Sequence, residues 1–476
     1  MRAIAGTTPK RGFQLSLQPA LAWMAIIGLA VLTVLLVVAG AGKILNYVFP
    51  AGAFLVGVFL YFRAPLLYTG FCWWIWFLAP LVRRLADFRG GGFTNPSPIL
   101  LAPYLVTLVT LITLRKHLPN ASRQGGMPFI LAIVGTVYGF LVGAINKSIQ
   151  TAVLGFLDWL PPVLFGFHLF VNWREYPSYR QNLERTFVWG TVVMGVYGVI
   201  QFLIAPEWER FWLTNAKIVS AGSPEPLGMR VWSTMSSPEP FAAVITAGLL
   251  LLFSAQSPVG FVASAGGYLS FLLTQVRSAW LGWVAGLLAM LGSLNPKFQM
   301  RLLVTVLVMT ICVVPLATIE PFSDVISERV SSLSDPQNDN SAIVRQGNYE
   351  KNLGRALTNV MGEGIGGAGF DSAVLTTLLN LGWFGTIPYI GGMLLLVFKL
   401  FQSSEGKSDP FVGAVRAIIL SCLVRFPVNG VTAEASGMVL WGFLGIGMAA
   451  VRYYQHQQWL KNYQLQNAAN ELDCSG

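Results

Sequence analysis

The chain has 476 residues, of which 54% are hydrophobic and only 11% are charged. A soluble domain carries roughly a quarter charged residues. Many stretches of this chain are apolar over the length needed to cross about 30 Å of hydrocarbon. These figures exclude a soluble enzyme, a secreted disulfide scaffold and a disordered chain, and they predict an all-α, polytopic membrane bundle.

The formal net charge of +10 has a membrane explanation. Lys and Arg are spread over short segments between the apolar stretches, so anionic lipid headgroups and topology account for most of it. We therefore expect membrane lipid, and no nucleic acid, among the partners. The four cysteines show no CxxC or Cys/His spacing, so neither structural zinc nor a disulfide framework is predicted.

Fourteen apolar segments are candidate spans, or twelve if the tight early pairs are re-entrant. They lie near 21–41, 44–62, 64–82, 98–114, 128–146, 152–172, 187–205, 240–256, 258–275, 279–295, 301–318, 376–402, 410–427 and 438–454. We divide the chain into N-terminal spans (1–205), a central part that carries the motifs (206–402), and the last spans with a tail (403–476).

Basic residues collect on one side of this predicted bundle. They are Arg2, Lys10, Arg11, Arg63, Arg115, Lys116, Arg123, Arg174, Arg180, Arg185, Lys297, Arg301, Lys399, Lys407, Arg452 and Lys461. The positive-inside rule predicts that this side is cytoplasmic, with both termini there. The longest polar segments, 206–239 and 319–375, then lie outside. Because the inner loops are short, we expect any chemistry on the outer face.

Two arginines lie where an outer segment meets an apolar one. Arg230 precedes the run Ser236-Ser237-Pro238-Glu239-Pro240 and a helix, where a serine cap and outward-pointing amides suit a phosphate. Arg277 sits between two apolar runs, where a charge is costly unless it is paired or lines a wet cavity. The alternatives are a snorkelling Arg230 and an interfacial belt formed by Trp280 and Trp283.

The run from Gly362 to Ser372 is rich in glycine and precedes a helix. Residues 364–369 spell GxGxxG, but no strand precedes them, so a dinucleotide site is not predicted. Gly364 and Gly366 permit close approach of the backbone to a ligand, with Asp371 at the start of the next helix. The alternative is that Asp371 is a plain N-cap.

Residues 341–357 are predicted to form an amphipathic helix that lies on the bilayer surface as a lid. Arg345 and Arg355 lie roughly on one side of it. A solvated face is the alternative explanation for most of its charges.

Ionisable residues inside the spans are functional candidates by default. These are Asp158, Arg416 and Glu434, and the first two are also the natural partners of an ion pair inside the bundle. None of the three histidines is expected on the outer face. No Walker A, HExxH, GxSxG or EF-hand pattern appears, so no cofactor and no metal are predicted.

Several of these features together resemble one family. They are an arginine before a Pro-containing helix start, the run VRSAWLGW (276–283), the loop helix IVRQGNYEKNLGRAL (343–357), the glycine-rich turn, and the helix FDSAVLTTLLNLGWFG (370–385). Their order, spacing and predicted side of the membrane are similar to those of the bacterial O-antigen ligase and O-antigen polymerase superfamily. The resemblance covers roughly residues 225–395.

The resemblance implies a GT-C-like, metal-independent glycosyltransferase in the bacterial plasma membrane, with its active site facing the periplasm. The donor would be an oligosaccharide on a polyprenyl diphosphate and the acceptor a sugar hydroxyl. Partner proteins would include a flippase and a chain-length regulator. Arg230 and Arg277 match the arginines that hold the diphosphate, and Arg345 matches a further arginine of the outer loop. Substrate contacts are also expected from Arg355, Gly364, Gly366 and Glu239.

One position departs from the family pattern. Ligases of this family carry a histidine where the loop enters the helix, and this chain has Asp371. The difference favours a polymerase over a ligase and makes Asp371 the candidate general base, with Glu363 and Glu239 behind it. Two other hypotheses remain open. One is an anion or small-solute transporter that uses Asp158, Arg416 and Glu434, and the other is a non-catalytic scaffold of an export complex.

Overall fold

The computed structural model describes residues 20–255, 257–291, 299–300, 307, 340–367, 369–406 and 409–474. Over these ranges the regular secondary structure is helical, and an isolated antiparallel bridge joins Gly222 to Met229. The predicted all-α class is therefore confirmed for the part of the chain that the structure describes.

The helices follow one another with short connections. They are α1 (Ala20–Val38), α2 (Gly42–Arg63), α3 (Pro65–Arg89), η1 (Pro98–Leu100), α4 (Leu101–Leu108), α5 (Leu111–His117), η2 (Leu118–Asn120), α6 (Met127–Asn146), α7 (Ile149–Val171), η3 (Trp173–Glu175), α8 (Tyr176–Ile204), α9 (Glu207–Ala216), η4 (Val219–Ala221), α10 (Pro238–Leu251), α11 (Gly260–Leu273), α12 (Arg277–Leu291), α15 (Asn340–Thr358), α16 (Ala373–Gln402), α17 (Pro410–Arg425) and α18 (Glu434–Cys474).

Most of the predicted spans correspond to these helices. Within the described ranges, nine helices are long and apolar enough to cross a membrane, so the apolar helices support a multi-pass membrane protein. One of the nine, Pro98–Asn120, consists of α4 and α5 with their flanking 3-10 turns. The predicted span 301–318, except for Leu307, lies outside the described residues, as does residues 319–339 of the predicted outer loop. The predicted total of twelve to fourteen spans stays a prediction.

Three helices are shorter than the spans predicted for them. α10, α11 and α12 contain 14, 14 and 15 residues. At 1.5 Å per residue they extend about 21–23 Å, less than the roughly 30 Å of a hydrocarbon core. The backbone of Gln275, with φ 57°, separates α11 from α12. Helices this short leave polar ends at membrane depth, where irregular backbone needs a surrounding of protein or water.

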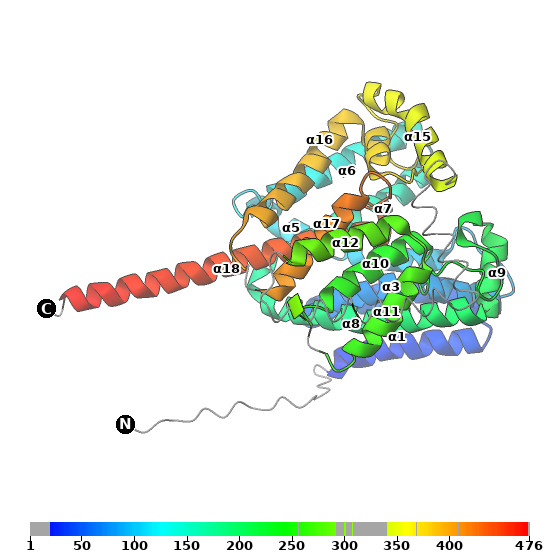
Figure 1. Cartoon of the computed structure of the whole chain (residues 1–476), viewed down its shortest axis with the longest axis horizontal. Helices are drawn as coiled ribbons and strands as arrows, with labels where there is room; N and C mark the ends of the chain where they lie inside the picture. The colour runs from blue at the N-terminus through cyan, green and yellow to red at the C-terminus, as the bar shows by residue number, and fades with distance from the viewer. Residues whose placement is uncertain are drawn as a thin grey trace.

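The two ends of the bundle differ. In Figure 1, α1 begins and α18 leaves the bundle on the left, whereas α9 and α15 lie on the right. We call the right-hand end, with α9 and α15, the site end, and the other the basic end. At the basic end the predicted inner loops meet, since Arg452 stacks on Phe170 and Trp173, and Arg180 pairs with Asp409. Which end faces the cytoplasm stays a prediction.

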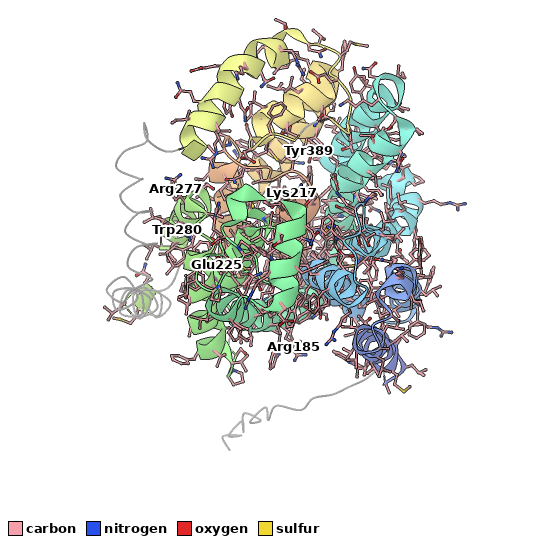
Figure 2. The ribbon with its side chains drawn as sticks, turned by 90° about the vertical axis from the view of Figure 1, so that its right-hand side faces the viewer. Arg185, Lys217, Glu225, Arg277, Trp280 and Tyr389 are labelled. Carbon is pink, nitrogen blue, oxygen red and sulfur yellow. The ribbon has the colours of Figure 1, made fainter. Side chains whose placement is uncertain are left out.

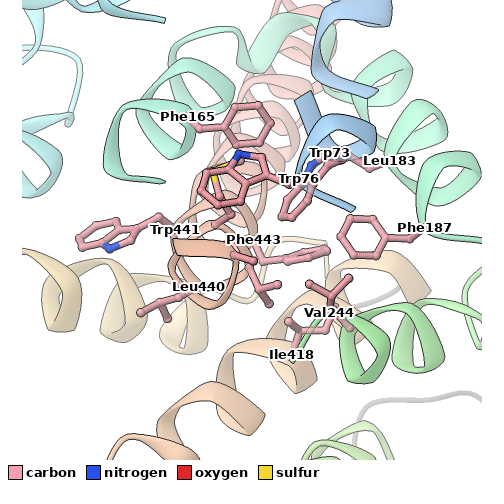
Figure 3. Packing of buried hydrophobic residues seen from close by; sticks show 14 of the residues in the cluster. Trp73, Trp76, Phe165, Leu183, Phe187, Val244, Ile418, Leu440, Trp441 and Phe443 are labelled. Atoms are coloured by element: carbon pink, nitrogen blue, oxygen red, sulfur yellow. The ribbon is translucent and has the colours of Figure 1, made fainter. Parts of the chain in front are cut away.

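Aromatic side chains fill the centre of the bundle (Figure 3). The ring of Trp73 lies 4.8 Å from that of Phe187 and 5.7 Å from that of Phe165, and Phe187 lies 5.2 Å from Phe443. Pairs of this kind contribute about 0.5–1.5 kcal/mol each beyond the area they bury. Because these residues come from α3, α7, α8 and α18, the packing fixes the helices whose ends form the site end.

Candidate functional site

A buried ion pair holds the segment that contains Arg230. The Arg84 side chain is fully buried, and its Nε lies 2.9 Å from Glu209 Oε2. Its two terminal nitrogens donate to the carbonyl oxygens of Met235 (2.6 Å) and Ser233 (2.5 Å). Removing one partner of such a pair costs about 3–5 kcal/mol. Arg84 therefore anchors the segment that leads into α10.

Glu209 joins further parts of this segment. Besides Arg84, it accepts hydrogen bonds from Tyr197 (2.5 Å) and from Trp232 Nε1 (3.1 Å). The sequence showed no sign of this network, because Arg84 and Glu209 are 125 residues apart. The only local signal is an arginine at the end of a long apolar segment.

Arg230 connects this segment to the turn between α11 and α12. Its guanidinium donates to the carbonyl oxygens of Ser220 (2.8 Å), Thr274 (3.1 Å) and Gln275 (3.3 Å). Gln275 stands two residues before Arg277, so the contact brings the two predicted phosphate-binding arginines to the same place. A guanidinium has five N–H groups, and these carbonyls take three of them.

Arg277 begins α12 at the site end, the end that faces the viewer in Figure 2. A cation at a helix N-terminus is unfavourable with respect to the helix dipole, so α12 itself gains nothing from this charge. Nearby, Trp280 Nε1 donates to the carbonyl oxygen of Phe271 at 3.4 Å. Trp283 is 6% exposed and packs against Tyr268, so the interfacial belt predicted as an alternative is wrong for Trp283.

Asp371 lies exposed at the start of α16, also at the site end. The N-cap is Ser372, whose Oγ accepts from Leu375 N at 3.3 Å, so the alternative interpretation of Asp371 as a plain N-cap is wrong. Ala373 N donates to the carbonyl oxygens of Phe426 (3.0 Å) and Asn429 (2.9 Å), which fixes this turn against the segment after α17. Among the described residues, nothing hydrogen-bonds or ion-pairs with the Asp371 side chain.

Glu239 and Arg425 form a second ion pair at this end. Arg425, at the C-terminal end of α17, is 1% exposed, whereas Glu239, in the first turn of α10, keeps 28% exposure. Ser436 Oγ donates to the other oxygen of Glu239 at 3.3 Å. Asp371 is near enough for its charge to act on Glu239. Two accessible carboxylates thus lie together above a buried arginine that the sequence analysis missed within the predicted span 410–427.

Two further carboxylates continue this group into the bundle. Glu434, exposed at the start of α18, interacts electrostatically with Glu239 and with Asp158. Asp158 accepts a hydrogen bond from Tyr104 at 2.7 Å. Arg416 instead donates to the carbonyl oxygens of Leu400 and Ser403, near the basic end. The predicted Asp158–Arg416 pair is therefore wrong, because the two residues lie near opposite ends of the bundle.

α15 confirms the predicted helix over 341–357 and packs beside α16. Tyr349 contacts Ser372 Oγ at 2.6 Å and donates to the carbonyl oxygen of Pro427 at 2.8 Å. Arg345, one turn earlier, is half-buried on the same face. Among the described residues, no hydrogen-bond partner meets its buried Nε.

The glycine-rich turn packs on α6 and α7. Gly364 and Gly366 have φ values of +86° and +97°. A Cβ on Gly364 would overlap the backbone of Gly143, and one on Gly366 would lie 2.6 Å from the carbonyl oxygen of Thr151. The close approach that these glycines permit is therefore to the chain's own helices. Contact with a ligand stays a prediction.

Charged side chains surround the same turn. Arg355 forms an ion pair with Glu363, and Lys147 Nζ donates to the carbonyl oxygen of Gly364 at 2.9 Å. Partial burial lowers the pKa of Lys147, as does the nearby charge of Arg355, while Glu363 opposes the shift. Arg355 is thus tied to Glu363 at the C-terminal end of α15, while Arg345 lies on the face that meets Ser372.

The described residues contain no group of three or more His, Cys, Asp or Glu side chains arranged to hold a metal ion. The chemistry available at the site end of the described structure is that of arginines and carboxylates. A comparison with protein-family models finds no match, and a comparison with curated proteins also finds none.

Proposed function

We propose that the chain is a membrane glycosyltransferase that polymerises a polyprenyl-diphosphate-linked glycan at the outer face of the bacterial plasma membrane. The site end would carry the active site and face the periplasm. Transfer to a different acceptor, as in a ligase, is the alternative within the same chemistry. A GT-C-like architecture belongs to this proposal.

The observation that carries the proposal is the contact between Arg230 and the turn before Arg277. It brings two arginines 47 positions apart in the sequence to one site, at the end of the bundle that also exposes Asp371. A diphosphate leaving group needs this arrangement, because arginines bind phosphate oxygens with paired hydrogen bonds and stabilise the charge that develops. The free N–H groups of Arg230 suit this role only in part, so we assign the larger share to Arg277.

In the proposed step, the hydroxyl oxygen of the acceptor sugar attacks the anomeric carbon of the donor. The bond from that carbon to the diphosphate breaks, and polyprenyl diphosphate leaves with the bonding electrons. The hydroxyl proton passes to the Asp371 carboxylate. An aspartate of ordinary pKa, about 3.9, is a weak base, which suits a reaction in which the leaving group departs ahead of the attack.

The other residues of the site have supporting roles in this proposal. Glu239, held by Arg425, would accept hydrogen bonds from sugar hydroxyls beside Asp371. Arg345, with its Nε facing inward on α15, would bind the diphosphate or the sugar from above. Arg355, Gly364 and Gly366 would act from further away by fixing the turn between α15 and α16.

The test is a reconstituted reaction. Purified protein in lipid vesicles receives polyprenyl-diphosphate-linked oligosaccharide, and the products are separated by size. We expect a ladder of lengthening glycans from the unchanged protein. Arg277→Ala should lower the rate by about 10²–10³, the cost of losing one donor to a developing charge.

Arg123→Ala is the matched control, since this exposed arginine precedes α6 at the basic end. It should leave the ladder unchanged. A single product on an added acceptor would identify a ligase instead. No product from several glycan donors, with folded protein, would contradict the proposal.

A further inference from the structure

The last part of α18 projects from the basic end of the bundle (Figure 1). The final contacts of α18 with other described segments are at Gln455, whose side chain donates to Glu405 at 3.4 Å, and at His456, whose ring lies 5.3 Å from that of Trp173. From residue 457 to 467, every residue except Leu460 is exposed.

This projecting segment, residues 457–467, carries large apolar side chains on its surface. Trp459, Tyr463 and Leu465 are 58%, 52% and 61% exposed. Seven of its other positions include five Gln or Asn residues, which give a helix little intrinsic stability. A helix in water gains most of its stability from packing an apolar face, so the segment needs a surface to pack against.

The aromatic residues lie along one side of the segment. Positions 456, 459, 463, 466 and 470 recur at alternating spacings of three and four, which is the heptad pattern of a coiled-coil seam. Within this stripe the rings of His456 and Trp459 stack at 5.9 Å, and those of Trp459 and Tyr463 stack at 5.6 Å. At 100° per residue, Lys461 and Gln457 fall on the opposite side.

We propose that this stripe packs against the same stripe of a second copy of the chain, in a parallel two-helix coiled coil. In a parallel pair related by a two-fold axis, each residue of the seam meets its own copy. A seam of ionised residues would repel itself there, whereas the amide of Gln466 both donates and accepts and therefore pairs with itself. Lys461, the charged residue between 457 and 467, faces away from the seam.

The membrane favours the same arrangement. Copies inserted with one orientation project this segment from the same face of the bilayer, so two segments meet side by side and parallel. The proposal needs no property of the site end, and it stands or falls independently of the proposed function.

The first test is disulfide cross-linking of the full chain in native membranes. Gln466→Cys places a thiol in the seam, and Gln457→Cys places one on the opposite side of the same helix. Both are made with Cys474→Ser, while Cys72 and Cys422 are buried. A disulfide needs Cα atoms within about 7 Å, so we expect at least about fivefold more covalent dimer from Gln466→Cys. Equal yields, or no dimer from Gln466→Cys, would overturn the proposal.

The second test measures the number of copies without any covalent link. Single-molecule photobleaching of the labelled chain in dilute vesicles should show two steps for the unchanged protein. Trp459→Lys with Tyr463→Lys should give mainly one step, because like charges would face each other across the seam. The control, Gln457→Lys with Gln464→Lys, should keep two steps. A two-step record from the seam variant, with all variants eluting as folded protein, would contradict the proposal.

Discussion

The carboxylates at the two ends of the bundle differ in how completely they are bonded. At the basic end, Asp409 is 7% exposed and accepts from Tyr176 (2.8 Å), Tyr454 (2.7 Å), Arg180 (2.8 Å) and Phe411 N (3.0 Å). At the site end, Asp371 is exposed and has no such partner among the described residues. Glu239 lies beside it and shares Arg425 and Ser436.

This difference separates structural from functional charge. A buried carboxylate with all its bonds made holds helices together, and its removal is felt as lost stability. Like charges kept close together and open to solvent stabilise nothing by themselves, so such groups are candidates for binding or catalysis. The predictions below ask whether bonding, rather than position in the bundle, decides which role a charge has.

The largest loss of stability should come from Arg84→Gln. Arg84 lies at the site end but is as completely bonded as Asp409, so we expect it to behave as a structural residue. Leaving Glu209 buried without its cation should lower the free energy of unfolding by about 3–5 kcal/mol. Thermal unfolding in detergent measures this change.

Arg89→Gln is the control, because Arg89 is exposed at the end of the same helix, α3. It should change the stability by less than about 0.5 kcal/mol. If both variants unfold at the same temperature, completeness of bonding does not identify structural charges in this protein.

A smaller loss is expected from Gly364→Ala. The new Cβ would overlap the backbone of α6, and the positive φ disfavours alanine, so we expect a loss of about 1–3 kcal/mol. Gly354→Ala in α15 serves as the control, since a Cβ there meets nothing within 4 Å. It should be neutral or slightly stabilising. A neutral Gly364→Ala would show that the turn moves away from α6 in solution and would favour its predicted role in ligand contact.

The sequence predicted the helices better than the contacts between them. Hydropathy located the long spans, and periodicity located α15, because both signals are local and recur every three or four residues. The start of α16 was also found, since Asp371 and Ser372 directly precede its apolar run. The lengths of α10, α11 and α12 were overestimated, because their apolar composition continues across the break that Gln275 makes.

The pairing of charges was not predictable from local patterns. Arg425 pairs with Glu239 across 186 positions, and nothing near either residue indicates the other. Arg416 was assigned to Asp158 because both are charges within apolar runs, and the structure places them near opposite ends. Only the packing of α10, α12, α17 and α18 decides which ionisable residues meet.

The most direct test of the account compares two aspartates, Asp371→Asn and Asp409→Asn, in the reconstituted transfer reaction. Each variant keeps the shape of the side chain and removes its charge. We expect Asp371→Asn to lower the rate per folded molecule by at least about 10²-fold and to leave the unfolding temperature unchanged. Asp409→Asn should lower the unfolding temperature and keep the rate per folded molecule. A full rate from Asp371→Asn would contradict the central claim that the exposed carboxylate of the site end performs the chemistry.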